Sequence, residues 1–193
     1  MLCGLKEVYY ANPMYGQNKY DNAAEEQKIE HLDRVHYMNV AANNLDLSSA
    51  VEGNKIVIIT AAQADGTYCR LPEATATNGG MHIKVVFGIA VADDFAVGTV
   101  TSNLIGGAIG VGDTDEAQGS SLDYATAIAD VGDTFKTVRF NLDTVAAAGG
   151  TGGTVLDFYY TGQANLIVYS GMLISEIDDP TLTGHFSTTV VTS

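Results

Sequence analysis

The four histidines are the residues of this chain best suited to metal binding or proton transfer, since imidazole serves both roles near neutral pH. They are His31, His36, His82 and His185. His31 and His36 stand five residues apart in a stretch that reads as helix, whereas two ligands on one helix face stand three or four apart. His82 falls on the more polar side of a predicted strand, where exposure to solvent accounts for it. With no H-E-x-x-H motif and no cluster of cysteine and histidine, we expect no metal site.

The densest group of acidic residues lies in a loop predicted over Asp113–Asp123, DTDEAQGSSLD. Clustered carboxylates can hold calcium through oxygen ligands. The EF-hand pattern fails here, because Ala117 occupies the third ligand position and Gln118 replaces the glycine. We favour a solvated acidic loop, and a bound ion is the alternative. The pairs Asp93-Asp94 and Asp178-Asp179 are interpreted as turn residues.

The serine and glycine motifs that mark many enzymes do not occur in the sequence. Ser120, Ser121 and Ser170 lack the G-x-S-x-G arrangement that exposes a hydrolase nucleophile. The glycines from Gly106 to Gly112 match neither the dinucleotide-binding fingerprint nor the P-loop. Nothing in the spacing supports a carboxylate pair for glycosidase chemistry. We therefore expect a protein that is not an enzyme, with no catalytic residues and no cofactor.

The charge of the chain excludes one class of partner. Its 193 residues include 23 acidic and 9 basic side chains, which gives a formal net charge of −14. Such a surface repels phosphate backbones and no basic cluster offsets it, so we expect no direct binding of nucleic acid. Hydrophobic residues make up 46% of the chain, enough to bury a core.

The cysteines and the longest uncharged segment do not suggest another class. Cys3 and Cys69 are far apart and in unlike surroundings, so we expect neither a disulfide framework nor a cysteine metal site. The N-terminal residues lack the basic start and apolar run of a signal peptide. Phe95–Gly112 is uncharged, but its polar residues and five glycines make it unsuitable as a membrane-spanning helix. We expect short strands joined by a glycine turn there.

The elements that must position these residues are strands, and Lys55–Phe87 shows them most clearly. This stretch reads as three short strands separated by turns at Ala64–Gly66 and Asn78–Gly80. After the second turn, apolar residues recur at every second position, which indicates a strand buried on one face and about twelve residues long. The residues of that face are Met81, Ile83, Val85, Phe87, Ile89 and Val91.

Further strands are expected at roughly even spacing. They are predicted over Val97–Ser102, Thr137–Leu142, Thr154–Tyr160, Asn165–Ser175 and His185–Val191. The third and fourth of these read as a hairpin across Thr161–Ala164. Because no long helices alternate with the strands, we predict a mainly β fold over residues 55–193, an antiparallel β-sandwich or jelly-roll-like domain without internal repeats.

Residues 1–54 differ in composition and are predicted to form an N-terminal arm. Four tyrosines, whose rigid amphipathic side chains suit anchoring on another surface, cluster near its start. They are Tyr9, Tyr10, Tyr15 and Tyr20. Asn22 and Glu25 form a capping box that opens one short helix from Ala23 to about Val40. The arm either packs on its own domain or lies across a neighbouring subunit, and both alternatives stay open.

The segment Thr67–Gly88 combines a strand that ends in Leu-Pro-x-Ala, a glycine turn and an alternating apolar strand. The residues that make up this motif are Leu71–Ala74, Gly79-Gly80 and Ile83–Phe87. In these features the chain resembles virion structural proteins of tailed bacteriophages, particularly small head-decoration (cement) proteins. The closing hairpin, Gly152–Leu173, also looks like theirs, so the resemblance spans roughly Lys55–Leu173. Such hairpins commonly carry a tryptophan in the last strand, where this chain has Tyr169 instead.

The resemblance implies a structural role in a virion. It implies a symmetric homo-oligomer, a homotrimer, that sits on the capsid surface and clamps neighbouring subunits of the major capsid protein. The four tyrosines would then be assembly contacts. The protein, made in the host cytoplasm, would become part of the virion and bind neither nucleic acid nor membrane. A tail-fibre or receptor-recognition module is one alternative, and a β-sandwich hydrolase is another.

Overall fold

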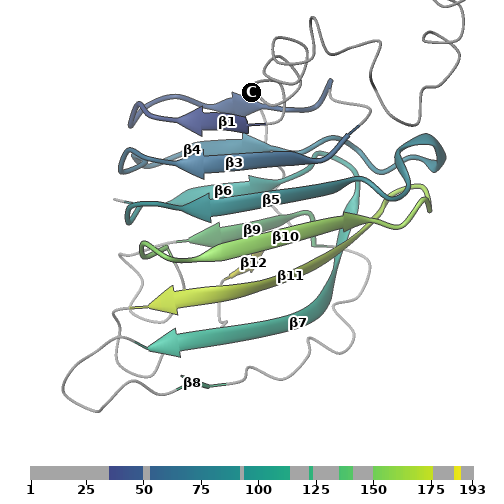
Figure 1. Ribbon diagram of the computed structural model, residues 1–193. Helices are drawn as coiled ribbons and strands as arrows, with labels where there is room; N and C mark the ends of the chain where they lie inside the picture. The colour runs from purple at the N-terminus through teal and green to yellow at the C-terminus, as the bar shows by residue number, and fades with distance from the viewer. Residues whose placement is uncertain are drawn as a thin grey trace, which may run out of the picture. The chain divides into compact units, whose positions relative to one another are not determined.

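The chain forms two β-sheets packed face to face, which confirms the predicted mainly β, sandwich-like class (Figure 1). The computed structural model describes residues 35–49, 53–91, 94–113, 122–123, 135–140, 150–175 and 185–187. Apart from Val35, these residues belong to the compact unit His36–Ser193.

Seven strands of the described residues form sheet A, which stands in front in Figure 1. In spatial order they are β1 (Val35–Met38), β3 (Lys55–Ile59), β5 (His82–Phe87), β10 (Val155–Tyr160), β11 (Leu166–Ser175), β7 (Asn103–Asp113) and β8 (Leu122–Asp123). Five shorter strands form sheet B behind it. They are β12 (Phe186–Ser187), β9 (Thr137–Phe140), β6 (Phe95–Gly98), β4 (Thr67–Arg70) and β2 (Leu45–Asp46). A short 3-10 turn, η3 (Ala76–Asn78), precedes β5.

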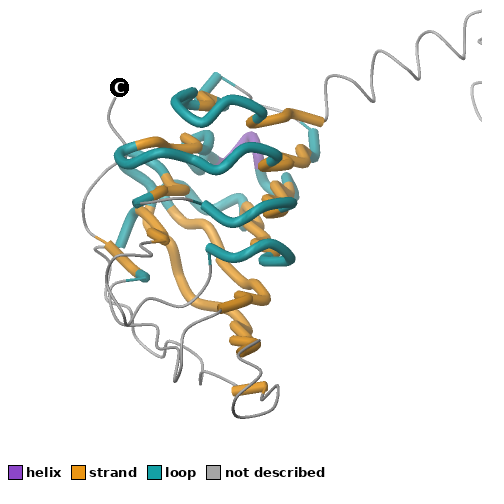
Figure 2. Tube along the Cα trace, turned by 90° about the vertical axis from the view of Figure 1, so that its left-hand side faces the viewer, coloured by secondary structure: helices purple, strands orange, loops and turns teal. Residues whose placement is uncertain are grey.

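The first six strands alternate between the two sheets, so the chain winds in stacked coils (Figure 2). Within each sheet the neighbouring coils run parallel, as in the pairs β2–β4, β3–β5 and β4–β6. Lys55 pairs with Ile83 and Thr67 pairs with Phe95, each 28 residues further along the chain. The sheets are therefore mixed. The expected antiparallel pairing holds for β5–β10–β11, β6–β9–β12 and β7–β8.

Parallel pairing follows from where the turns lead the chain. The predicted turn at Ala64–Gly66 is present, and Gly66 adopts a positive φ of 73° there. It carries the chain from β3 in sheet A to β4 in sheet B instead of folding it back along β3. A return to sheet A then places β5 parallel to β3, whereas a tight hairpin would have made the two strands antiparallel.

Strand β5 confirms the predicted alternation but is half the predicted length. Ile83, Val85 and Phe87 face the core, with 0%, 0% and 1% of their surface exposed. The strand ends at Phe87 because Gly88 and Ile89 form a bend, and the side chain of Ile89, predicted to face the core, is 43% exposed.

The glycine-rich passage is a long strand, not a turn between short strands. β7 runs for eleven residues beside β11 and parallel to it. Met172 lies over Gly110, and Ile174 lies over Gly112, where a Cβ atom would come within 3.0–3.2 Å of the covering side chain. Glycine therefore leaves room for the neighbouring side chains. Among the described residues no helix is long and apolar enough to cross a membrane.

The helix predicted from Ala23 to about Val40 is wrong at its C-terminal end. Residues Val35–Met38 form β1 at the edge of sheet A, and the residues before Val35 lie outside the described ranges. Pairing of this segment in the sheet buries Met38, which is only 2% exposed. That tertiary contact overrides the local helical pattern. Strand β2 also lies within the range 1–54 that composition assigned to the arm.

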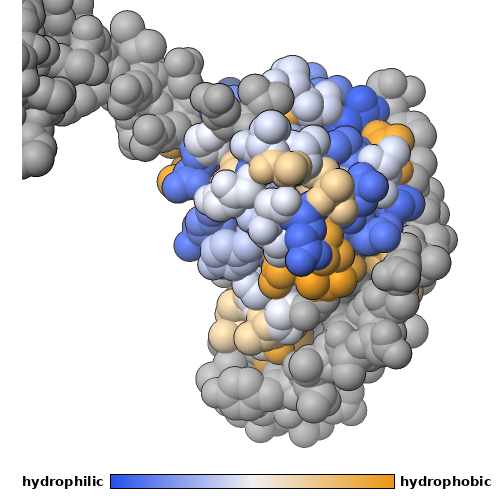
Figure 3. All heavy atoms as spheres, turned by 90° about the vertical axis from the view of Figure 1, so that its right-hand side faces the viewer, coloured by the Kyte–Doolittle hydropathy of each residue, from blue (hydrophilic) through white to orange (hydrophobic). Residues whose placement is uncertain are grey.

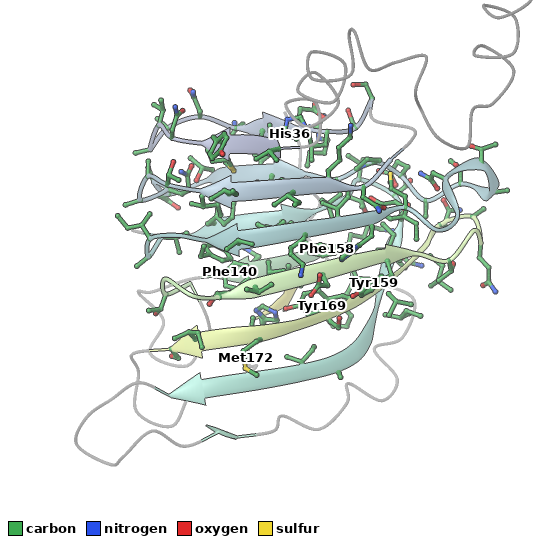
Figure 4. The ribbon with its side chains drawn as sticks, viewed as in Figure 1. His36, Phe140, Phe158, Tyr159, Tyr169 and Met172 are labelled. Atoms are coloured by element: carbon green, nitrogen blue, oxygen red, sulfur yellow. The ribbon has the colours of Figure 1, made fainter. Side chains whose placement is uncertain are left out.

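Aromatic rings fill the space between the two sheets. Phe87 of sheet A packs against Phe95 and Phe140 of sheet B, with ring centroids 5.9 and 5.0 Å apart. Phe158 and Tyr169, on neighbouring strands of sheet A, lie 5.3 Å apart (Figure 4). Each fully buried phenylalanine stabilises the fold by about 1.5–3 kcal/mol, so these rings hold the sheets together and fix which side of each strand faces outward.

Candidate functional site

Several residues singled out in the sequence lie outside the described ranges. They include the proposed assembly contacts Tyr9, Tyr10, Tyr15 and Tyr20, together with His31 and Cys3. Of the acidic loop Asp113–Asp123, the structure describes only Asp113, Leu122 and Asp123. The roles suggested for all of these residues stay predictions.

The three described histidines lie in three different environments. His36 is on the edge strand β1, His82 is on the outer side of β5, and His185 is fully buried just before β12. Within the described part of the chain, no three histidine, cysteine, aspartate or glutamate side chains lie close enough together to hold a metal ion. The role of each of these histidines must therefore be inferred from the side chains and backbone groups around it.

His185 ties the two sheets together as a neutral side chain. Its Nε2 atom lies 2.9 Å from the hydroxyl oxygen of Tyr169 on β11, and its Nδ1 atom lies 3.2 Å from the backbone carbonyl of Arg139 on β9. Burial lowers the pKa of His185 to about 4, although the contact with Arg139 acts in the opposite direction. A histidine held uncharged between hydrogen-bonding partners is suited to structural support.

Cys69 does not have the surroundings of a nucleophile. Its side chain is completely buried on β4, and burial raises the pKa of its thiol to about 12, with a smaller contribution from the charge of Asp46. Since the thiolate is the reactive species, a thiol that stays protonated is inert.

One end of the sandwich is held by a single carboxylate. Glu73, in the loop after β4, accepts hydrogen bonds of 2.6–3.2 Å from three consecutive backbone N–H groups and two hydroxyl groups. The donors belong to Val100, Thr101 and Ser102. Burial alone would raise the pKa of Glu73, but the hydrogen bonds outweigh burial and hold it below its ordinary value. Because Glu73 already fills this cradle, the cradle is a structural lock and not an open anion site.

The loop end of the sandwich, at the right of Figure 1, has a largely polar surface. Figure 3 faces this end and shows many blue and white residues, with orange and pale orange residues among them, chiefly near the centre. Here the turn before β5 meets the turn between β10 and β11, and a Cβ atom on Gly79 would come within 2.7 Å of the Gly162 backbone. The close packing of Gly79 against Gly162 and the hydrogen bonds of Glu73 both hold loops of this end in place, so we assign this end a structural role.

A cluster of polar and charged side chains lies in the middle of the outer side of sheet A. His82 Nε2 lies 2.7 Å from Asp157 Oδ1, and Lys84 Nζ lies 3.5 Å from the same oxygen. The ring of His82 stacks on Tyr159, with centroids 4.4 Å apart and only 6° between the planes. Pairing of β5 with β10 places Lys84 opposite Asp157 and His82 opposite Tyr159. The sheet thus joins residues that lie far apart in the sequence.

Apolar side chains surround this cluster on β3, β5, β10 and β11. Ile56, Tyr159 and Met172 are 38%, 44% and 38% exposed, so large apolar side chains reach the surface on both sides of the cluster. We call this surface the sheet A face. It consists of Ile56, Ile58, His82, Lys84, Val86, Val155, Asp157, Tyr159, Val168, Ser170 and Met172. Figures 1 and 4 view the molecule from this side.

The order of strands on the sheet A face does not fit a catalytic triad. Ser170 on β11 is the cross-strand partner of Asp157 on β10, and His82 lies beyond Asp157 on β5. In a triad the imidazole lies between the hydroxyl and the carboxylate, whereas here the carboxylate lies between the other two. An exposed apolar area with a charged centre fits contact with another protein, because burial supplies affinity and the charges fix orientation.

Sequence reasoning found only part of this surface. The alternation after Gly80 correctly placed His82 and Lys84 on the outward side of their strand. The cluster itself was missed, because nothing in the sequence indicated that β10 would pair with β5. The predicted hairpin of Thr154–Tyr160 with Asn165–Ser175 is confirmed, and it correctly placed β11 beside β10.

Comparison of the chain with family models, with curated proteins and with solved structures found no match.

Proposed function

We propose that this chain is a structural virion protein that decorates and stabilises a bacteriophage capsid as a symmetric homo-oligomer. The observation that carries the proposal is the sheet A face, an exposed apolar surface around an ion pair. Contiguous exposed apolar patches are typical of protein–protein contact sites. The resemblance of Thr67–Gly88 to head-decoration proteins suggests the kind of assembly.

Charge supports a protein partner. The chain as a whole carries a formal charge of −14, but the sheet A face balances Lys84 against Asp157. Contact through this face is therefore not opposed by a local excess of negative charge, whereas the rest of the chain is expected to repel polyanions. Packaged DNA and membranes are not partners in this proposal.

A symmetric oligomer suits attachment to a shell. Several weak contacts made at once hold neighbouring subunits together, because each contact raises the effective concentration of the next. We assign contact between copies to the sheet A face. Contact with the major capsid protein is assigned to Tyr9, Tyr10, Tyr15 and Tyr20, since tyrosine supplies large rigid contact area.

Co-sedimentation with mature, DNA-filled heads of the virus that encodes the chain tests the proposal. The full chain should pellet with the heads in many copies per particle. A variant with all four arm tyrosines changed to alanine should stay in the supernatant. The variant Tyr68→Ala, which removes a partly exposed tyrosine from sheet B, should pellet like the wild type. If the full chain binds heads at no stage of their maturation, the proposal is overturned.

A tail-fibre or receptor-recognition module is the second candidate, favoured by the exposed ring of Tyr159 beside the His82–Asp157 pair. Aromatic rings beside polar side chains also suit contact with carbohydrate. This candidate predicts few copies per particle, located at the tail. Immunogold labelling of whole virions separates the two, because decoration labels the head over its entire surface.

A further inference from the structure

The sheet A face carries matched chemistry on the two sides of the line between β5 and β10. Across this line the Cα partners are Lys84 and Asp157, which have opposite charges, and Val86 and Val155, which have the same side chain. The third pair is His82 and Tyr159, whose rings stack. A surface with this arrangement is complementary to a copy of itself turned by 180° about that line.

We propose that two copies of the chain pair through the sheet A face, with a two-fold axis parallel to the strands and between β5 and β10. This rotation places β5 of each copy over β10 of the other. Lys84 then faces Asp157 of the partner subunit, and Val86 faces Val155 of the partner subunit. Strands related in this way stay aligned, which is one of the two usual arrangements for packed sheets.

The outer strands fit the same rotation in the row of Val86 and Val155, whereas in the next row Ile56 faces Ser170 of the partner subunit. Ile58 on β3 is level with Val86, and Met172 on β11 is level with Val155. The two-fold axis therefore sets Ile58 against Met172 of the partner subunit, so an apolar side chain meets an apolar side chain. Lys84 and Asp157 lie two residues along their strands from Val86 and Val155, and therefore inside the contact. Their charges fix how the strands of one copy are aligned along those of the other.

The area of the sheet A face suits a weak, reversible interface. Four strands about 4.8 Å apart and three rows of side chains about 7 Å apart give roughly 400 Å² per copy, or on the order of 800 Å² in total. Stable interfaces bury about 1,200 Å² or more and transient ones bury less, so this contact belongs to the weak, transient class. The pair should therefore form reversibly and dissociate on dilution.

This inference rests on the proposed function only in using the same face for contact between copies. A two-fold pair would present two N-terminal segments to a shell, which is enough for bivalent attachment. The resemblance implies a trimer, whereas a self-complementary face favours a pair. The native mass distinguishes the two, because a trimer has three times the mass of one chain and a pair has twice that mass.

Two charge reversals test the pairing, with mass measured by light scattering. Lys84→Glu places two acidic side chains on the face, and Asp157→Lys places two basic ones there. Each variant alone should have the mass of a single chain at concentrations where the wild type has twice that mass. An equimolar mixture of the two should recover the double mass, because opposite charges again face each other across the axis. Thermal melts of each variant show whether it is folded.

The control is Arg70→Glu, which disrupts an ion pair on sheet B and should leave the mass unchanged. Three results would overturn the pairing: a wild type with the mass of one chain at all concentrations, single variants that keep the double mass, or a mixture of folded variants that stays monomeric. Co-sedimentation with heads reports separately on the proposed function. Pairing without binding to heads would overturn the capsid role alone, and binding to heads by a trimeric wild type would overturn the pairing alone.

Discussion

The outer sides of the two sheets are built from the same alternating strands but carry different chemistry. On sheet B the outward side chains include Arg70, which pairs with Asp46 at 3.0 Å and lies over the ring of Tyr68, and Arg139, which pairs with Asp94. On sheet A the outward side chains are mostly apolar, and several are more than a third exposed.

The difference shows which sheet has partners for its outward side chains within one chain and which sheet does not. On sheet B, Arg70 and Arg139 have ion-pair partners on its own strands and adjoining loops, so these charges gain little from a further contact. Sheet A leaves apolar side chains in solvent around one ion pair, and burying them against another protein would be favourable. Changes to sheet B should therefore lower stability, whereas changes to the sheet A face should lower association.

The largest expected effect concerns the link between the two sheets. Below pH 6.5 the unfolded chain protonates His185, whereas the folded chain does so only near pH 4. The unfolded state thus binds more protons in this range, and the free energy of unfolding should fall by about 3 kcal/mol from pH 6.5 to pH 4. Urea titrations across this range measure the loss. His185→Gln should abolish most of it, and an unchanged slope in that variant would contradict the assignment.

The second prediction concerns the ion pairs of sheet B. Asp94→Ala removes the partner of the partly buried Arg139 side chain and should lower the free energy of unfolding by about 1–3 kcal/mol without changing the native mass. Asp46→Ala makes the same change at the other ion pair, where the side chain of Arg70 that is left without its partner is only 13% exposed, and it should lower the free energy of unfolding by a similar amount. A change in native mass for Asp94→Ala would show that sheet B also affects association, which contradicts the distinction between sheet B and the sheet A face.

The third prediction makes the opposite change on sheet A. Met172→Gln keeps the length of the side chain but makes it polar, and it should weaken association about tenfold, equivalent to about 1.4 kcal/mol. Stability should change by less than about 0.5 kcal/mol, because this side chain is partly exposed. Val100→Gln alters a similarly exposed apolar residue outside the face and should not affect association. Equal effects of the two variants would show that the sheet A face has no special role.

The smallest effect is expected from Arg70→Lys. Lysine keeps the charge opposite Asp46 but loses the planar contact of the guanidinium with the ring of Tyr68. Stability should fall by about 0.5 kcal/mol in a denaturant titration, and the native mass should not change. Loss of association in this variant would indicate that sheet B also takes part in assembly.

Features that depend on one segment could be predicted from the sequence, and features that depend on pairing could not. The alternation around Val85 and the hairpin between β10 and β11 are local, and both were predicted correctly. The glycines gave no sign that β7 would be a strand, since that depends on the side chains of β11 that cover it. Turn residues indicate where the chain changes direction, but they do not indicate which sheet it enters next. The parallel pairs β2–β4, β3–β5 and β4–β6 were therefore not predicted.

The candidate site was hidden for the same reason. His82 and Asp157 lie 75 positions apart, and only the pairing of β5 with β10 brings them within 2.7 Å. The Glu73 lock likewise depends on a loop 27–29 residues further along the chain. Residue types alone showed that these side chains were polar, but their partners are set by tertiary structure.

Oxidation of methionine by dilute peroxide, read by mass spectrometry at low and high protein concentration, tests the central claim most directly. Met172 is 38% exposed in one chain, whereas Met38 and Met81, at 2% and 5%, provide internal references for buried positions. If the sheet A face is the contact between copies, Met172 should oxidise readily in dilute solution and become protected as the concentration rises. Equal oxidation of Met172 at every concentration, in samples whose mass shows association, would contradict the account.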